Sequence, residues 1–76
     1  MPDTKILIVE DDKSTSLVLN QILLKKNYSV SAIVASGEAA LYEIERNLPD
    51  IVLMDIFLEG QLDGVQTAEF INERHQ

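Results

Sequence analysis

A chain of 76 residues has room for one small domain at most. Its 46% of hydrophobic residues is typical of a globular protein, and no apolar run approaches the ~20 residues that cross a membrane. The formal net charge of −7 argues against nucleic-acid binding by this segment, and the lack of cysteine excludes disulfides and thiolate metal sites. The N-terminus has no pattern of a signal peptide, so we expect a cytoplasmic globular domain.

The chain begins with a predicted strand followed by a predicted helix. Residues 5–9 are predicted to form a strand, since residues 6–9 are a continuous apolar run of the kind found in buried strands. The helix is expected to begin after Asp12 or Ser14, both good N-cap residues, and to run to about Lys26. Asn27 is expected to adopt the left-handed conformation that ends many helices. Pairs at i, i+4 spacing predict that the core face of this helix carries Val18, Leu19, Ile22 and Leu23.

Two more strands and two more helices are predicted in the rest of the chain. Residues 28–34 alternate between apolar and polar side chains, as in a half-exposed edge strand, and Ser36 is expected to cap the next helix. Residues 51–55 follow Pro49 as an apolar run and predict a buried parallel strand. Asp63 is expected to cap the last helix. The expected inner positions of these two helices are Ala40, Ile44, Leu48, Val65, Ala68 and Ile71.

The alternation of strands and helices predicts an α/β fold. Right-handed crossovers and a reversal after the second strand give the strand order 2-1-3. The edge strand is then residues 51–55, the most apolar of the three. An open apolar edge of this kind favours pairing with another chain.

Acidic residues follow both apolar strands. Asp11 comes after the first strand and Asp55 ends the third, 44 residues later. Because the carboxyl ends of adjacent parallel strands share one edge, we expect the two carboxylates to converge on one oxygen-loving cation. Mg²⁺ suits a site with few carboxylates and several waters, and it would allow one carboxylate to attack phosphorus. The alternative for acids before a helix is simple capping, and it accounts for Asp12.

Four stretches of the chain resemble the receiver domain of two-component response regulators. They occur in the order and at the spacing of that family, and together they cover most of the chain. The stretches are residues 6–12 (ILIVEDD), 35–41 (ASGEAAL), 48–55 (LPDIVLMD) and 62–68 (LDGVQTA).

The resemblance implies a flavodoxin-like (CheY-like) doubly wound parallel sheet, here truncated to βαβαβα, and a role in phosphorelay signal transduction. A sensor histidine kinase or a phosphotransfer protein would transfer a phosphoryl group to Asp55, a phosphoacceptor rather than an enzyme's catalytic residue. By position, Mg²⁺ would be held by Asp11 and Asp55, by Glu10 often through water, and by the backbone carbonyl of Phe57.

The chain departs from the family pattern in its length. A receiver domain has five βα units, and residues 1–76 supply the first three. The family's Ser/Thr after strand four and Lys after strand five have no counterpart before Gln76. The family's usual proline in the loop after the acceptor is also absent, and Glu59 and Gly60 occupy that region.

Two other functions are alternatives to phosphorelay signalling. The first is a self-associating structural fragment that does not switch and forms a homodimer through the open edge of the third strand. The second is a phosphohydrolase with an aspartyl nucleophile, which the sequence disfavours because the common Asp-x-Asp arrangement is absent at residues 55–57.

Overall fold

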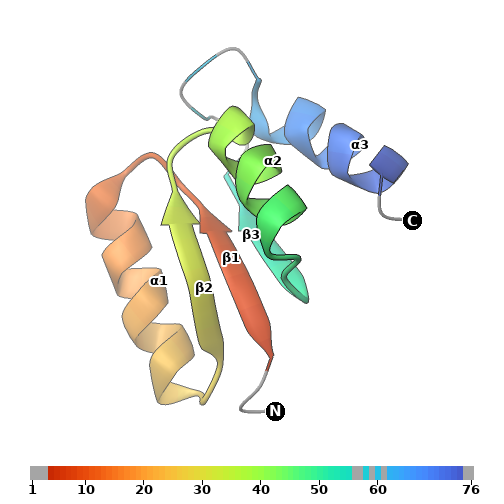
Figure 1. Ribbon diagram of the computed structural model, residues 1–76. Coiled ribbons are helices and arrows are strands. Elements are labelled where there is room, and N and C mark those ends of the chain that lie inside the picture. The colour runs from red at the N-terminus through yellow and green to blue at the C-terminus, as the bar shows by residue number, and fades with distance from the viewer. Residues whose placement is uncertain (1–3, 56–57, 59, 61, 75–76) are drawn as a thin grey trace.

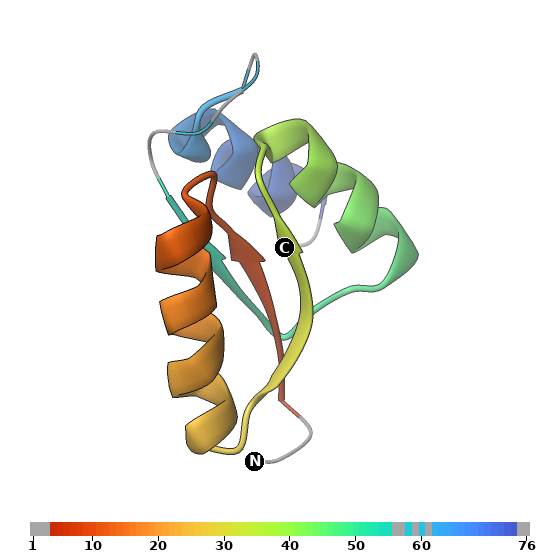
Figure 2. The same cartoon turned by 90° about the vertical axis from the view of Figure 1, so that its left-hand side faces the viewer.

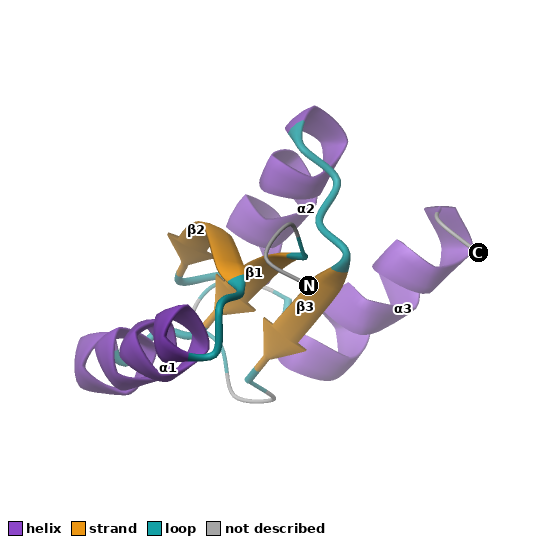
Figure 3. Cartoon of the chain, turned by 90° about the horizontal axis from the view of Figure 1, so that it is seen from below, coloured by secondary structure: helices purple, strands orange, loops and turns teal. Residues whose placement is uncertain are grey.

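The computed structural model describes residues 4–55, 58, 60 and 62–74, which form one three-stranded parallel sheet flanked by helices (Figure 1). Helix α1 covers one face of the sheet, and α2 and α3 lie on the other (Figures 2 and 3). In chain order the elements are β1 (Lys5–Val9), α1 (Lys13–Lys25), β2 (Ser29–Val34), α2 (Gly37–Arg46), β3 (Ile51–Met54) and α3 (Gly64–Arg74).

Strand β1 is the centre of the sheet. It pairs in parallel with β2 on one side and with β3 on the other, which confirms the predicted order 2-1-3. Ile6 to Val9 are all buried, as expected for a central strand with both faces covered. Among the described strands, β3 pairs with β1 alone, so its outer edge is open as predicted.

Polar side chains fix where the helices begin and end. Asp12 is the N-cap of α1 and accepts a hydrogen bond from the Thr15 backbone N–H at 2.9 Å. The helix ends before Asn27, whose φ of 68° is left-handed as predicted. Ser36 caps α2 in the same way. None of the described helices is both long enough and apolar enough to span a membrane.

The hydrophobic core lies mainly between the sheet and α2. Leu7 and Val9 of β1 contact Ala40 and Ile44 of α2, and all four are buried. Half-buried apolar residues of β2, β3 and α3 pack around this cluster. The prediction that Ala40 and Ile44 are inner positions of α2 is therefore correct. The same prediction is wrong for Leu48, which is exposed because the helix has already ended at Arg46.

The predicted core face of α1 is only partly correct. Leu19 and Leu23 are half-buried, but Val18 is 55% exposed and Ile22 45% exposed. The helix packs against β1 and β2. A sheet of three strands covers only one side of the helix's broad apolar stripe, and the other side faces outwards.

The predicted inner stripe of α3 is also partly wrong. Ile71 packs against the core, whereas Val65 and Ala68 are exposed. The reason is that α3 packs against α2 through Thr67, which is fully buried and lies against Gly37. Val65 and Ala68 instead line an open hollow beside Met54 of β3.

Candidate metal centre

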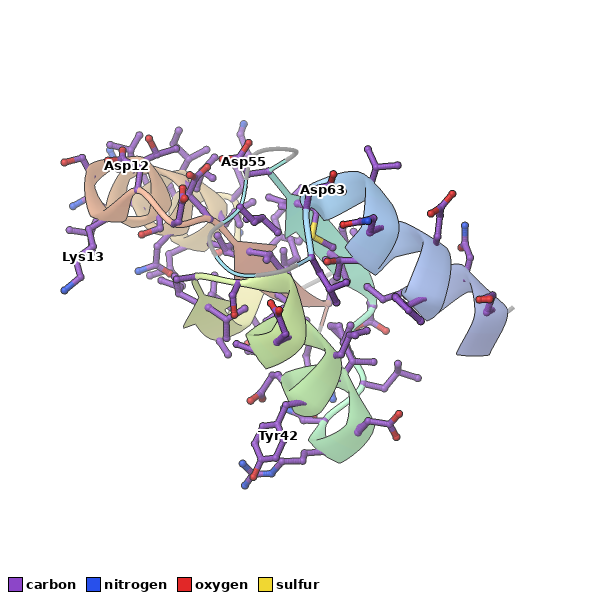
Figure 4. All side chains as sticks on the ribbon, turned by 90° about the horizontal axis from the view of Figure 1, so that it is seen from above. Asp12, Lys13, Tyr42, Asp55 and Asp63 are labelled. Carbon is purple, nitrogen blue, oxygen red and sulfur yellow. The ribbon has the colours of Figure 1, made fainter. Side chains whose placement is uncertain are left out.

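Three acidic residues meet at the carboxyl edge of the sheet. Glu10 and Asp11 follow β1, and Asp55 follows β3. Each offers a carboxylate oxygen, and these oxygens all lie within 4.8 Å of one another. Figure 4 looks down on this edge, where Asp55 lies between the start of α1 and the start of α3. The predicted convergence of Asp11 and Asp55 is confirmed.

Backbone hydrogen bonds of the sheet position the acids. The Asp55 N–H donates to the carbonyl of Val9 at 2.9 Å, which continues the β1–β3 ladder to the acid itself. The Glu10 N–H donates to the carbonyl of Val34 at 2.9 Å and ties this residue to the end of β2. The site is thus built on the ends of strands, which are rigid supports.

The surroundings of Glu10 change the pKa of its carboxyl group. It accepts a hydrogen bond from the Asp12 backbone N–H at 3.1 Å, and this contact favours ionisation. Partial burial, the charges of Asp55 and Asp11 and a side-chain hydrogen bond with Asp55 act in the opposite direction, and together they raise the pKa of Glu10 above its ordinary value. Like charges this close repel one another unless a proton or a cation is bound.

The three acids fit Mg²⁺. Two oxygens bound to one Mg²⁺ at about 2.0–2.1 Å are at most about 4.2 Å apart. The observed spacing of up to 4.8 Å thus requires only a small side-chain movement, or a water between one carboxylate and the ion. A hollow of about 230 Å³ adjoins the acids and is lined by Val9, Glu10, Leu19, Leu53, Met54 and Asp55. Asp55 borders this hollow together with Leu19 of α1.

The raised pKa of Glu10 predicts two opposite effects for Glu10→Gln. The folded state binds a proton on Glu10 more readily than the unfolded state does. Protonation of Glu10 therefore stabilises the fold, and this stabilisation is present below the ordinary pKa of 4.5 and is lost as pH rises through the raised pKa. At neutral pH in EDTA, the neutral glutamine should therefore raise the melting temperature. The same substitution should weaken Mg²⁺ binding, and in the wild type Mg²⁺ binding should weaken as pH falls through the raised pKa. Calorimetry with and without Mg²⁺ measures both effects, and a lower melting temperature in EDTA would contradict the account.

The remaining predicted residues have simpler positions. The Asp12 carboxylate caps α1 by accepting hydrogen bonds from the hydroxyl and the backbone N–H of Thr15. These hydrogen bonds lower the pKa of Asp12. Phe57, whose carbonyl is an expected ligand, lies outside the described residues. Asp63 caps α3 by accepting from the Gln66 N–H at 2.8 Å, as the sequence predicted.

A comparison with known families agrees with this architecture. The family model described as the response regulator receiver domain matches residues 6–76. The chain belongs to this family. This match confirms the resemblance found in the sequence. The carboxyl edge described above is thus the carboxyl edge of a receiver-domain sheet.

Two relatives of this receiver chain are longer proteins. The sensory transduction protein RegX3 of Mycolicibacterium smegmatis is 42% identical over 71 residues, which are 93% of this chain and 30% of that protein. A protein-glutamate methylesterase/protein-glutamine glutaminase of Trichodesmium erythraeum is 30% identical over 77 residues, covering 100% of this chain and 22% of that protein. The receiver chain therefore spans less than a third of either relative.

A solved structure has the same fold. It is the N-terminal domain of a response regulator/sensory box/GGDEF 3-domain protein from Carboxydothermus hydrogenoformans, with 44% identity and a TM-score of 0.87. The match covers 95% of the receiver chain described here and 58% of the solved chain. The flavodoxin-like arrangement in a shortened form is thus confirmed.

Proposed function

We propose that this receiver domain accepts a phosphoryl group on Asp55 from a sensor histidine kinase or a phosphotransfer protein in the cytoplasm. Glu10, Asp11 and Asp55, with the backbone carbonyl of Phe57, are the proposed Mg²⁺ ligands. The observation that carries the proposal is the meeting of three carboxylates from two adjacent strands within 4.8 Å. The chain acts here as a phosphoacceptor and not as an enzyme on a separate substrate.

The chemistry is a displacement at phosphorus. A carboxylate oxygen of Asp55 forms the new O–P bond while the P–N bond of the phosphohistidine breaks and the imidazole keeps the electron pair. Bound Mg²⁺ supplies positive charge that offsets the repulsion between the carboxylates and the phosphoryl oxygens. Asp11 and Glu10 hold that charge next to Asp55, and the hollow beside Leu19 and Leu53 leaves the approach to the acceptor open.

Labelling with a small phosphodonor tests the proposal. A parent protein, meaning one that carries this chain within a complete receiver domain, is incubated with radioactive acetyl phosphate and Mg²⁺. It is expected to incorporate one phosphoryl group that hydroxylamine removes, as it does for an acyl phosphate. Chelation of Mg²⁺ by EDTA should abolish incorporation. A phosphoryl group that resists hydroxylamine, or that is incorporated equally in EDTA, would refute it.

We also propose that residues 1–76 provide the first three of the five βα units of a receiver domain. This proposal is supported by the match to the solved receiver structure, of which the chain covers only a part. The Ser/Thr and Lys that complete the phosphorylation site in the family would then be supplied after residue 76. Labelling of the 76-residue chain beside its parent shows how much of the reaction the first three units support.

A second candidate function is self-association through the edge of β3. Ile51 is 42% exposed although it lies in a strand, and among the described strands β3 has a partner on one side only. A second copy could bury this edge by pairing with it across a twofold axis.

A charge placed on the edge tests self-association. We expect the wild-type chain to sediment as a dimer at micromolar concentrations and Ile51→Lys to sediment as a monomer, because a lysine on an edge strand opposes pairing. Ile33→Lys is the matched control, since Ile33 is 40% exposed on β2, the other edge strand. A folded wild-type monomer, or equal loss of the dimer in both variants, would contradict pairing through β3.

A further inference from the structure

The first turn of α2 lies against Gly60, Leu62 and Thr67, at two separate contacts. The first is at Gly37, which is buried. A Cβ atom on Gly37 would overlap the Oγ1 atom of Thr67 and would lie 3.0 Å from the Cβ of Leu62. Thr67 is fully buried and its hydroxyl donates to the carbonyl of Asp63 at 2.8 Å. The start of α3 is therefore packed directly on the backbone of α2.

The second contact is between Glu38 and Gly60. Gly60 has a φ of +91°, a conformation that side-chain-bearing residues rarely adopt. A Cβ on Gly60 would lie 2.7 Å from Oε1 of Glu38 and 3.3 Å from Oε2. The Glu38 carboxylate thus fills the space beside the Gly60 backbone, five residues after Asp55.

The same framework carries the acids. The carbonyl of Val34, at the end of β2, accepts the hydrogen bond from the N–H of Glu10. Two residues later Ser36 caps α2 and fixes the direction of its first turn. The turn of α2 that contacts Gly60 therefore begins two residues after the strand end that binds Glu10.

We propose that Glu38 is a positioning residue for the acid cluster: its carboxylate holds the segment at Gly60 and so sets the position of Asp55 relative to Glu10 and Asp11. This inference rests on the proposed Mg²⁺ site. A simpler role for Glu38 is electrostatic, because an acid in the first turn interacts favourably with the helix dipole. The two roles differ in what they require: positioning requires the length of the side chain and its oxygen atom, whereas the dipole requires the charge.

Three substitutions separate these roles. Glu38→Gln keeps the length and an acceptor oxygen but removes the charge, Glu38→Asp keeps the charge but shortens the side chain, and Glu38→Ala removes both. Mg²⁺ affinity of the 76-residue chain is measured by titration followed by NMR. Since groups that orient ligands typically change metal affinity by 10-fold or more, we expect Asp and Ala to weaken binding about tenfold and Gln to resemble the wild type. Glu43→Gln, elsewhere on α2, controls for the change in net charge.

The amide resonances in EDTA give a second readout that does not depend on Mg²⁺. Glu38→Asp and Glu38→Ala should shift the resonances of both Gly60 and Asp55 and leave that of Leu7, in the buried strand β1, unchanged. If the wild type bound no Mg²⁺, the proposed metal site would fail while the Asp55 resonance still decided the positioning role. Shifts at Gly60 without a shift at Asp55, or Mg²⁺ affinity that follows charge rather than length, would overturn the proposal.

Discussion

Replacing Asp55 with asparagine is expected to remove all phosphoryl incorporation from the parent protein. The amide group is neutral and is a poor nucleophile towards phosphorus, so no acyl phosphate forms. The fold should survive, because the Asp55 backbone N–H that bonds to Val9 is unchanged and the substitution relieves repulsion from Glu10. Labelling with acetyl phosphate, with circular dichroism as a check on folding, measures this result.

Asp50→Asn is the matched control for this experiment. Asp50 lies just before the opposite end of β3 and accepts a hydrogen bond from the Lys5 N–H at 2.8 Å, which an asparagine oxygen can also accept. The change in net charge is the same, but labelling should be retained. Persistent labelling of Asp55→Asn, or equal losses in the two variants, would show that Asp55 is not the acceptor.

Replacing Asp11 with asparagine is expected to weaken Mg²⁺ binding by at least about tenfold, or about 1.4 kcal/mol. The variant loses one charged ligand of a cation that depends on few protein carboxylates. Isothermal titration calorimetry at neutral pH and fixed ionic strength measures the change. The apo protein should be no less stable, since one of the repelling charges has been removed.

The neighbouring residue provides the control for Asp11. Asp12→Asn makes the same change in charge one residue away, at a position where asparagine is an equally good N-cap. Its Mg²⁺ affinity should remain close to that of the wild type, because Asp12 points to Thr15. If both variants lost affinity equally, the effect would be one of net charge and not of coordination.

The strands and their order could be predicted from the sequence because short continuous apolar runs, residues 6–9 and 51–54, mark strands of a parallel sheet. β1, with neighbours on both sides, is buried as expected, whereas β3 is only half-buried and its Ile51 is exposed, because it has a neighbour on one side only among the described strands. The helix starts at Asp12 and Ser36 were also predictable, since capping depends on residues close in sequence.

The buried faces of α1 and α3 were less predictable. An apolar stripe shows which side of a helix favours burial, but the width of the partner surface decides how much is buried. Val18 and Ile22 are exposed because only part of α1 meets the three-stranded sheet. Val65 and Ala68 are exposed because α3 packs on α2 through Thr67, a contact between two helices that periodicity within one helix does not reveal.

The acids of the candidate site were predictable, but their surroundings were not. Glu10, Asp11 and Asp55 follow strands, so parallel pairing alone brings them together. The contacts of Gly37 and Glu38 join residues 20 to 30 positions apart through a loop. The one local signal was glycine at the first position of a helix, where its lack of a side chain suggests a close approach by another element.

A crystal structure of the chain with Mn²⁺ in place of Mg²⁺ tests the central claim most directly, because the anomalous signal locates the ion itself. One ion is expected at the carboxyl edge of the sheet, about 2.0–2.2 Å from oxygens of both Asp11 and Asp55. An ion bound to one of these two residues alone, or located away from this edge, would contradict it.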